Sequence, residues 1–495
     1  MKPFIKNLYN IALLINLLLI INLLGIQPIF KFHVHCDLAY GLVTLSKYFL
    51  LSFSSREIPW KNVIAFASDN CSVMKGRHNS VLSRIKKVQP NVLDIGCICH
   101  LANLCCVHGV KQLPLPVEEL LIDVFFHFNH SAKRKEIYRE FLEFCDVAPL
   151  KILKHATTRW LSLQRCVKRF LQQWPALLSY FRSHEDCDHP GRVKRCADYL
   201  ASLEMKAYFM FLAFILEPLN QFNTIFQTDA TQIAILLPEM NRLLRVFMAK
   251  FVTMRVIKSA EDLTTVPFAD RSQQLDNSIL AVGMELRSML ANDEDDLEEA
   301  TVTRVFDSVR KFYVAVVTKM INIFPFHDDV LRDLAALNPD PALRESWSAP
   351  SVLDLAVRFG LVADEDHHAL VAEFQDYQLS PEDELPVYTA HSRVDTFWAE
   401  MGKKKTFAGG VRFPHLARVM TTMSVIAHSN ADSERVFSMC RKIDTDARSQ
   451  LGNDTLRALL SCKINTDEPC YEFRPDSDLL KSAKSATWNY VKDHQ

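Results

Sequence analysis

The spacing of hydrophobic residues changes along the chain, from strand-like near its beginning to helical further on. The run from Val63 to Ala67 reads Val-Ile-Ala-Phe-Ala and is followed at once by the turn formers Ser68, Asp69 and Asn70. A short apolar run with β-branched residues and a polar end is typical of a buried strand. The run from Val92 to Ile98 has similar character. We therefore predict two strands, with Asp69 at the C-terminal end of the first.

Helical spacing dominates after Val117. One apolar stripe runs from Trp160 to Phe181, and Tyr208 to Phe226 is apolar on nearly every side, which predicts a buried helix kinked near Pro218. The acidic run between Asn292 and Glu299 predicts an exposed linker. The stretch from Asn338 to Glu384, rich in proline and acids, predicts loops and short helices.

Two short amphipathic helices are predicted near the C-terminus, with Asp432 and Asp454 as their N-caps. Their apolar faces are rich in aliphatic and aromatic residues, among them Val436, Phe437, Leu459 and Leu460. Two short helices this close leave apolar surface that needs a partner, either in the chain or in a second copy.

The first residues form a segment of a different kind. Leu8 to Phe30 is nearly continuous Leu and Ile, interrupted by four amide residues, and is about long enough to cross a bilayer. Three interpretations compete: a signal anchor, a secretory signal without a recognisable cleavage site, or a translated non-coding stretch in place of the true N-terminus. We favour the third, with a membrane helix second.

Charge and cysteine content narrow the function classes. Lys plus Arg is 57 and Asp plus Glu is 58, a net charge of −1, so the whole chain does not attract phosphate at long range. The 13 cysteines are odd in number and scattered, which indicates a reducing compartment. Local basic patches are candidates for nucleic-acid contact, although such runs are most often solvated faces; they are Arg84, Lys86 and Lys87, then Lys133, Arg134 and Lys135, then Lys403, Lys404 and Lys405.

A cluster of cysteines and histidines follows the second strand. A Cys-x-x-His pair runs from Cys97 to His100, with Cys105, Cys106 and His108 close behind. No second pair with zinc-ligand spacing follows. We favour a buried, structural role for Cys97 and His100 over a zinc site, and both stay open.

Three stretches, taken together, resemble the hAT family of DNA transposases. The first is Ser-Asp-Asn-Cys-Ser-Val-Met-Lys-Gly from Ser68 to Gly76, followed by the Cys97 to His100 element. The second is Thr-Arg-Trp at residues 158 to 160, and the third runs from His428 to Ser438. Their order and wide spacing, with a helical block between the second and third, carry the resemblance, which covers roughly residues 58 to 465.

The resemblance implies an α/β fold with a large all-α insertion, in which an RNase H-like core is interrupted by a helical domain. It also implies strand cleavage and transfer at three carboxylates that hold Mg²⁺ or Mn²⁺, because hard oxygen ligands from separate elements suit these cations. By this resemblance Asp69 matches the second acid and Glu434 the third, as catalytic and metal-binding residues. The first acid is not found, since Asp37 is the only upstream Asp and its neighbours do not match. The N-terminal zinc finger is missing as well.

Each of these residues also has a simpler structural role. Asp69 could end its strand in an Asx-turn, and Glu434 could stabilise the first turn of a helix. In the family the Arg-Trp element, here Arg159 and Trp160, lies near the active site, where the ring can stack on an unpaired base. Trp160 could equally be a core residue at a helix start.

The chain is therefore predicted to be a nuclear, transposase-derived protein that dimerises and lacks a complete catalytic set, and so needs no cofactor. The alternative is an active hAT-type DNA transposase, using Mg²⁺ or Mn²⁺, whose true N-terminus is missing. A membrane-anchored protein is a third hypothesis that rests on Leu8 to Phe30 alone. DNA binding is expected to be weak, and the partner a second copy bound through the C-terminal segment. The expected organisation is 1–57 atypical hydrophobic segment, 58–155 partial RNase H-like core, 156–400 helical insertion, 401–470 dimerisation segment and 471–495 tail.

Overall fold

The structure is a computed structural model of the 495-residue chain. It describes residues 59–155, 162–184, 191–228, 230–291, 297–389, 391–445, 448, 451–465, 468 and 471–493, together with the backbone of 18–21. The chain divides into two compact units, one ending at Asp432 and one beginning at Ser433.

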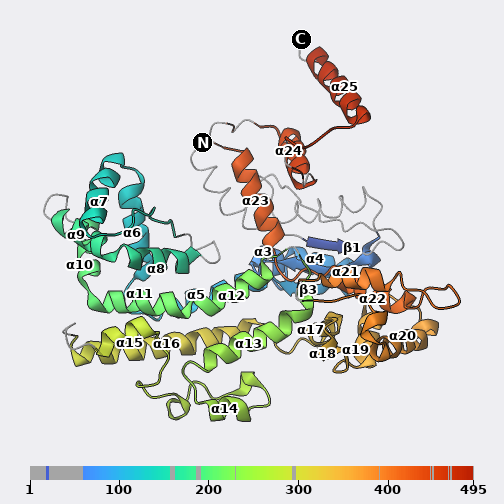
Figure 1. The fold of residues 1–495 in the computed structure, drawn as a ribbon, viewed down its shortest axis with the longest axis horizontal. Helices are drawn as coiled ribbons and strands as arrows, with labels where there is room; N and C mark the ends of the chain where they lie inside the picture. The colour runs from blue at the N-terminus through green and yellow to red at the C-terminus, as the bar shows by residue number, and fades with distance from the viewer. Residues whose placement is uncertain are drawn as a thin grey trace. The chain divides into compact units, whose positions relative to one another are not determined.

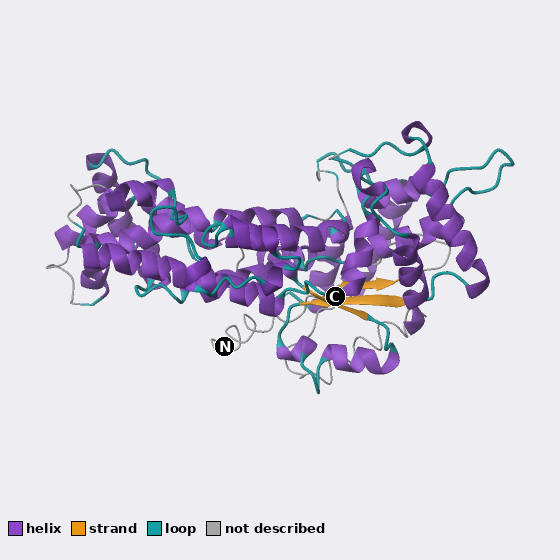
Figure 2. Cartoon of the chain, turned by 90° about the horizontal axis from the view of Figure 1, so that it is seen from below, coloured by secondary structure: helices purple, strands orange, loops and turns teal. Residues whose placement is uncertain are grey.

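The first unit contains a three-stranded sheet in the order β1-β2-β3 (Figure 2). Strand β2 (Val63–Ser68) is buried along its whole length, and β3 (Leu93–Gly96) pairs with it in parallel, with Ala65 opposite Leu93. Both predicted strands are confirmed, and the second is shorter than expected because a helix begins at Ile98. Asp69 follows β2 directly, as predicted.

Strand β1 (Leu18–Ile21) lies inside the Leu- and Ile-rich segment and pairs antiparallel with β2. Leu18 lies opposite Ala67 and Ile21 opposite Val63. These four residues are extended, whereas a membrane helix from Leu8 to Phe30 would make them helical. The rest of that segment lies outside the described residues, so the interpretations of the N-terminus stay predictions.

Helices make up 67% of the residues that the structure describes. In the first half of the chain, α3 and α4 connect β2 with β3, and further helices follow β3 (Figure 1). They are α3 (Ser72–Lys75), α4 (Val81–Val88), α5 (Ile98–Val110), α6 (Val117–Asn129), α7 (Ala132–Phe144), α8 (Ser162–Gln172), α9 (Trp174–His184), α10 (Arg192–Ala201), α11 (Leu203–Ile215) and α12 (Glu217–Phe226).

The remaining helices of the first unit follow α12 along the chain. They are α13 (Leu236–Met248), α14 (Met254–Ser259), α15 (Met284–Ala291), α16 (Glu299–Ile323), α17 (Asp329–Leu334), α18 (Pro341–Arg344), α19 (Ala349–Phe359), α20 (His367–Leu379), α21 (Val394–Met401) and α22 (Pro414–Ser424). Short helices between residues 338 and 384 were predicted and are confirmed.

Two predicted helices are interrupted where a proline permits a new start. The expected stripe from Trp160 to Phe181 is split into α8 and α9, with Pro175 in the first turn of α9. The apolar stretch around Pro218 is split into α11 and α12, with Pro218 in the first turn of α12. Proline lacks the N–H that a continuous helix needs, but is tolerated in a first turn.

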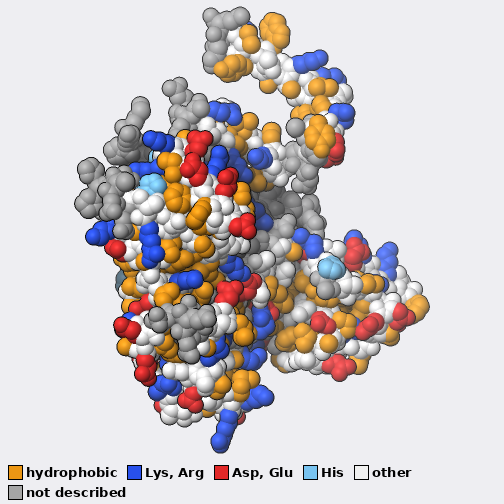
Figure 3. All heavy atoms as spheres, turned by 60° about the vertical axis from the view of Figure 1, so that its left-hand side comes forward, with side chains coloured by type: hydrophobic (Ala, Val, Ile, Leu, Met, Phe, Trp, Pro, Cys, Tyr) orange, Lys and Arg blue, Asp and Glu red, His pale blue; other side chains and the backbone are white. Residues whose placement is uncertain are grey.

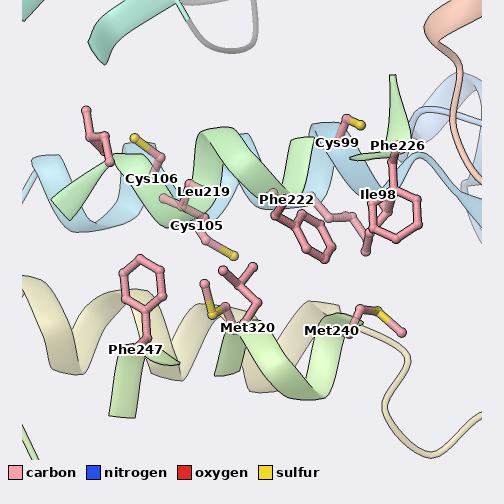
Figure 4. Close-up of a cluster of buried hydrophobic side chains, with 14 of the residues drawn as sticks. Ile98, Cys99, Cys105, Cys106, Leu219, Phe222, Phe226, Met240, Phe247 and Met320 are labelled. Atoms are coloured by element: carbon pink, nitrogen blue, oxygen red, sulfur yellow. The ribbon is translucent and has the colours of Figure 1, made fainter. Parts of the chain in front are cut away.

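The centre of the first unit is built around α5, which packs against α12 and α16. Figure 4 shows Cys105 and Cys106 of α5, Phe222 of α12 and Met320 of α16 in this core, and all four side chains are buried. The closest approach is at Gly109, where a β-carbon would lie 2.5 Å from a methyl group of Val316. Because residue 109 is glycine, the backbone of α5 can lie directly against side chains of α16.

Among the described residues one helical run, Leu203–Phe226, is long and apolar enough to cross a membrane, and half of its most apolar stretch is buried inside the protein. Its buried side chains include Tyr208, whose hydroxyl donates to Glu204 at 2.8 Å. A core helix has the same properties, so this run does not distinguish the two environments.

The second unit contains the greater part of α23 (Ala431–Ile443), then α24 (Asn453–Asn465) and α25 (Ser477–Asp493). The two helices predicted near the C-terminus are confirmed, but both begin two residues earlier than the expected N-caps imply. Asp432 therefore lies in the first turn of α23 and is not its N-cap.

The predicted α/β fold with a large helical part is confirmed at this level: a mostly helical protein with a small sheet that contains one parallel pair of strands. The first unit includes the segments 58–155 and 156–400 together with residues 401–432, and the division between units falls inside the segment 401–470.

Candidate functional site

The candidate site lies at the carboxyl end of β2, where Asp69 leaves a fully buried strand. Asp69 is 9% exposed, and its backbone carbonyl accepts a hydrogen bond from the Ser68 hydroxyl at 2.9 Å. One carboxylate oxygen, Oδ1, is buried without a hydrogen-bond partner among the described residues. A buried acceptor left unpaired is costly, and such groups concentrate at sites that bind something or store strain.

The turn after Asp69 is held tightly by the motif residues that follow it. Helix α3 is a single turn that ends at Gly76, whose N–H donates to the Ser72 carbonyl at 2.8 Å. A β-carbon on Gly76 would lie 2.3 Å from that carbonyl oxygen, so only glycine fits. The last residue of the motif is thus required by the backbone.

The side chains nearest Asp69 are a thiol and an ammonium group. Burial, then the charge of Asp69 and a hydrogen bond to it, raise the pKa of Cys71 to about 11. Lys75 is nearly buried and forms an ion pair with Asp94 of β3. Burial lowers the pKa of Lys75 even though the charges of Asp94 and Asp69 act to raise it. Both side chains therefore respond to a negative charge on Asp69.

A cavity of about 180 Å³ lies beside this turn. Asn70, Lys75 and Asp94 line it from the side of the sheet. The Asn70 side chain lies against Gly96 at the end of β3, where a β-carbon would come within 3.0 Å of its amide oxygen. Asp328, the N-cap of α17, lines the opposite part.

The Cys-x-x-His element starts α5 directly after β3. Cys97 is the N-cap of this helix, and its N–H donates to the Ser68 carbonyl at 3.0 Å, which joins the helix start to the end of β2. Cys97 and Cys99 are buried, and the Cys99 sulfur lies 3.8 Å from the Asn223 carbonyl oxygen. The buried position supports the structural role predicted for Cys97.

The electrostatics of this element are set by burial and by backbone donors. Burial acts to raise the pKa of Cys97, but hydrogen bonds from the Cys99 thiol and from backbone N–H groups, including that of Asn430, lower it below its ordinary value. Burial lowers the pKa of His100 although the charge of Asp69 acts to raise it. Among the described residues, no group of three or more His, Cys, Asp or Glu side chains is placed to hold a metal ion.

The start of the third motif lies against the first one. The N–H of Asn430 donates to the sulfur of Cys97 at 3.4 Å, across 333 positions of sequence. The Ser429 hydroxyl donates to the Phe226 carbonyl at the end of α12, at 2.6 Å, and the ring of His428 accepts from the Gln232 N–H at 3.4 Å. The long helical block therefore leaves the sheet region and returns to it.

The other predicted site residues are distributed differently. Glu434 lies in the first turn of α23 within the second unit, so its predicted pairing with Asp69 stays a prediction. Val436, Phe437 and Leu460 are partly exposed, and Leu459 is 36% exposed. In one copy of the chain these four side chains do not form a closed core.

Arg159 and Trp160 lie outside the described residues, but the residues flanking them are hydrogen-bonded. His155 accepts or donates through Nδ1 to the Ser162 hydroxyl at 3.3 Å, and its Nε2 lies 2.9 Å from Glu118 Oε1. These hydrogen bonds connect His155 and Ser162, on either side of the segment 156–161, with α6. The sequence analysis did not single out these three residues, because nothing in their spacing connects Glu118 to His155.

Sequence reasoning did not predict the ion pair of Lys75 with Asp94 or the contact of Asn430 with Cys97. Lys75 and Asn430 lie within motifs that were recognised, so their position in a motif was the available signal. Asp94 had no comparable signal, because its approach to Lys75 depends on the parallel pairing of β2 and β3.

No protein-family model matches the chain.

Proposed function

We propose that the chain is a hAT-type, transposase-derived protein that forms a homodimer through its C-terminal segment and lacks a complete set of catalytic acids. In this proposal β2 and β3 belong to an RNase H-like core, interrupted by the helices between α6 and α22. The observation that carries it is the contact of Asn430 with Cys97. Two of the three stretches that resemble hAT transposases meet there, although the helical block separates them in sequence.

Exposed apolar surface supports dimerisation. Helix α25 spans Ser477–Asp493, yet Leu479, Leu480 and Tyr490 are 48%, 47% and 65% exposed. In proteins most of the stability of a helix comes from packing its apolar face against other groups. On α24, Leu459 and Ile464 are exposed as well. A second copy of the chain is the partner that presents the same faces, as isologous dimers require.

The direction of β1 supports the proposal that the first catalytic acid is missing. In the hAT family that acid lies upstream, on the first strand of the core. Here β1 runs antiparallel to β2, so its C-terminal residue Ile21 lies opposite Val63, at the start of β2. With about 3.3 Å per residue, that point is about 20 Å along the strand from Asp69. An acid placed after β1 would therefore miss Asp69.

The described residues near Asp69 do not fit a divalent metal by themselves. Mg²⁺ and Mn²⁺ prefer several oxygen ligands, whereas Asp69 has a thiol and an ammonium group beside it, and Asp94 is engaged with Lys75. We accordingly propose no cofactor, a nuclear location, and weak DNA binding in line with the net charge of −1. Arg159 and Trp160 remain the proposed nucleic-acid contacts.

An active DNA transposase is the alternative, and one observation favours it: the unpartnered carboxylate oxygen of Asp69 at a strand end. In that case Glu434 and a first acid from a different N-terminus would join Asp69 and hold Mg²⁺ or Mn²⁺. The metal would activate the attacking water or 3′-hydroxyl and stabilise the leaving oxygen.

Incubating the purified chain with duplex DNA and Mg²⁺ or Mn²⁺ separates these two functions. We expect no strand cleavage above the level of an Asp69→Asn variant, because two acids without a third position metal poorly. The measurement is the yield of cut strands on a denaturing gel. Metal-dependent cleavage that is lost in Asp69→Asn would show that the acid set is complete and would establish the alternative.

A further inference from the structure

A cavity of about 300 Å³ opens between α6, α7 and residues 149–152, away from the turn after Asp69. Three aromatic rings line it, those of Phe125, Phe128 and Tyr138. Three cationic side chains line it as well, those of Lys135, Arg139 and Lys151, and no carboxylate does so among the described residues. The cavity therefore combines flat apolar surface with an excess of positive charge.

The aromatic lining is held firmly by its neighbours. Phe128 and Tyr138 are 3% and 4% exposed, and their ring centroids lie 4.7 Å apart. Tyr180 packs against both rings, at 5.0 Å from Phe128 and 5.7 Å from Tyr138. Of the three rings, that of Phe125 is the most exposed, and it offers the face on which a flat ligand can stack.

The hydroxyl of Tyr138 supplies an independent sign of a ligand. It is buried and has no hydrogen-bond partner among the described residues, although Tyr138 lines the cavity. Buried tyrosine hydroxyls usually find a partner. A ligand with an oxygen or ring nitrogen at this point would accept its hydrogen bond.

The cations are available for an anion. Arg139 and Lys151 are exposed and form no ion pair with the described part of the chain, while the Lys135 ammonium donates to the Asn129 carbonyl at 3.2 Å. Nearby, Lys154 lies 6.0 Å from the ring centroid of Phe125. In Figure 3, which brings the α6 to α10 end of the first unit forward, basic, acidic and hydrophobic side chains lie interspersed on the surface.

We propose that this cavity binds a single nucleotide, with the base stacked on Phe125 beside the buried pair Phe128 and Tyr138, and the phosphate on Lys135, Arg139 and Lys151. Aromatic rings stack on bases of any sequence, and cations beside them hold the phosphate. The volume is at the lower end of ligand pockets, which suits one nucleotide. An aliphatic acid would use the charge but not the ring faces, and inorganic phosphate would leave the rings and the Tyr138 hydroxyl unused.

The nucleotide can come from solution or be an unpaired residue of a strand, and two probes distinguish these sources. The full chain is titrated with thymidine monophosphate by calorimetry and with labelled single-stranded oligodeoxythymidine by fluorescence anisotropy. Binding of the monophosphate identifies a free nucleotide, and binding of the strand alone identifies a nucleotide within DNA or RNA. Binding of either probe at this cavity supports the proposal.

Substitutions in the cavity lining test whether the probe binds there. The double variant Arg139→Glu with Lys151→Glu should bind the probe with an affinity about tenfold lower or lower still, because charge-assisted contacts to the phosphate are lost and replaced by repulsion. Tyr138→Phe, which removes only the hydroxyl, should weaken it by roughly threefold to tenfold. The matched control is Arg255→Glu with Lys258→Glu on α14, where both side chains are exposed, and it should bind as the unaltered chain does.

Four results would overturn the proposal: no binding of either probe, unchanged affinity in the Arg139 and Lys151 variant, an equal loss in the α14 control, or displacement of the probe by inorganic phosphate or lauric acid as readily as by thymidine monophosphate. The test does not involve Asp69 or the C-terminal helices. Its outcome is therefore independent of whether the protein dimerises or cuts DNA.

Discussion

Replacing Leu459 and Leu460 together with aspartate is expected to convert the protein from a dimer to a monomer. Both leucines lie on the apolar side of α24 and are only partly covered within one chain. Burying a leucine contributes about 1.5–3 kcal/mol, so losing two should weaken dimerisation by about a hundredfold or more. Sedimentation velocity over a dilution series measures the change.

The matched control places the same two charges on the exposed side of α24, as Ala458→Asp with Ser461→Asp. This pair should dimerise like the unaltered chain, and circular dichroism should show equal helix content in both variants. If both pairs dissociate equally, overall charge decides the association and α24 is not the interface. If neither pair dissociates, the C-terminal segment does not hold the dimer.

Phe222→Ala is expected to lower the free energy of unfolding by about 3–5 kcal/mol, the range for a large aromatic residue in a closed core. The Phe222 side chain is 0% exposed and packs against Phe226, with ring centroids 4.9 Å apart. The carbonyl of Phe226 accepts the hydrogen bond from Ser429, so a loosened α12 should also release the start of the third motif. Urea denaturation followed by circular dichroism measures the loss.

Phe407→Ala is the control for this substitution, because Phe407 is fully exposed. It should change the free energy of unfolding by about 0.5 kcal/mol or less. A loss below about 1 kcal/mol in Phe222→Ala would mean that α12 is not packed between α5 and the helices beyond it.

The sequence predicted well those elements whose pattern is decided locally. The run Val63 to Ala67 is apolar throughout because both faces of β2 are covered, and the polar residues after it end the strand. The helix starts at Trp174 and Glu217 were less clear, since a proline in an apolar helical stretch can mark either a kink or a new first turn.

Pairing between distant segments could not be predicted. Nothing in the residues Leu18 to Ile21 indicates a strand, because continuous Leu and Ile suit a helix as well. Their extended conformation depends on the backbone partners that β2 provides. The contact of Asn430 with Cys97 likewise depends on where the helical block ends, which no local spacing records.

For the candidate site, the position of Asp69 at a strand end followed from the sequence, but its surroundings did not. The ammonium group of Lys75 next to Asp94 arises only when β3 lies beside β2 and α3 turns back over both. The roles of Glu434, Arg159 and Trp160 stay predictions that rest on the motifs.

Dimerisation is the activity that we propose for this protein, and the mass of the full chain in dilute solution measures it. One chain has a mass of 56.7 kDa. Sedimentation equilibrium should give twice that mass at micromolar concentration, with dissociation to 56.7 kDa on dilution. A single species of 56.7 kDa at every concentration would contradict the account.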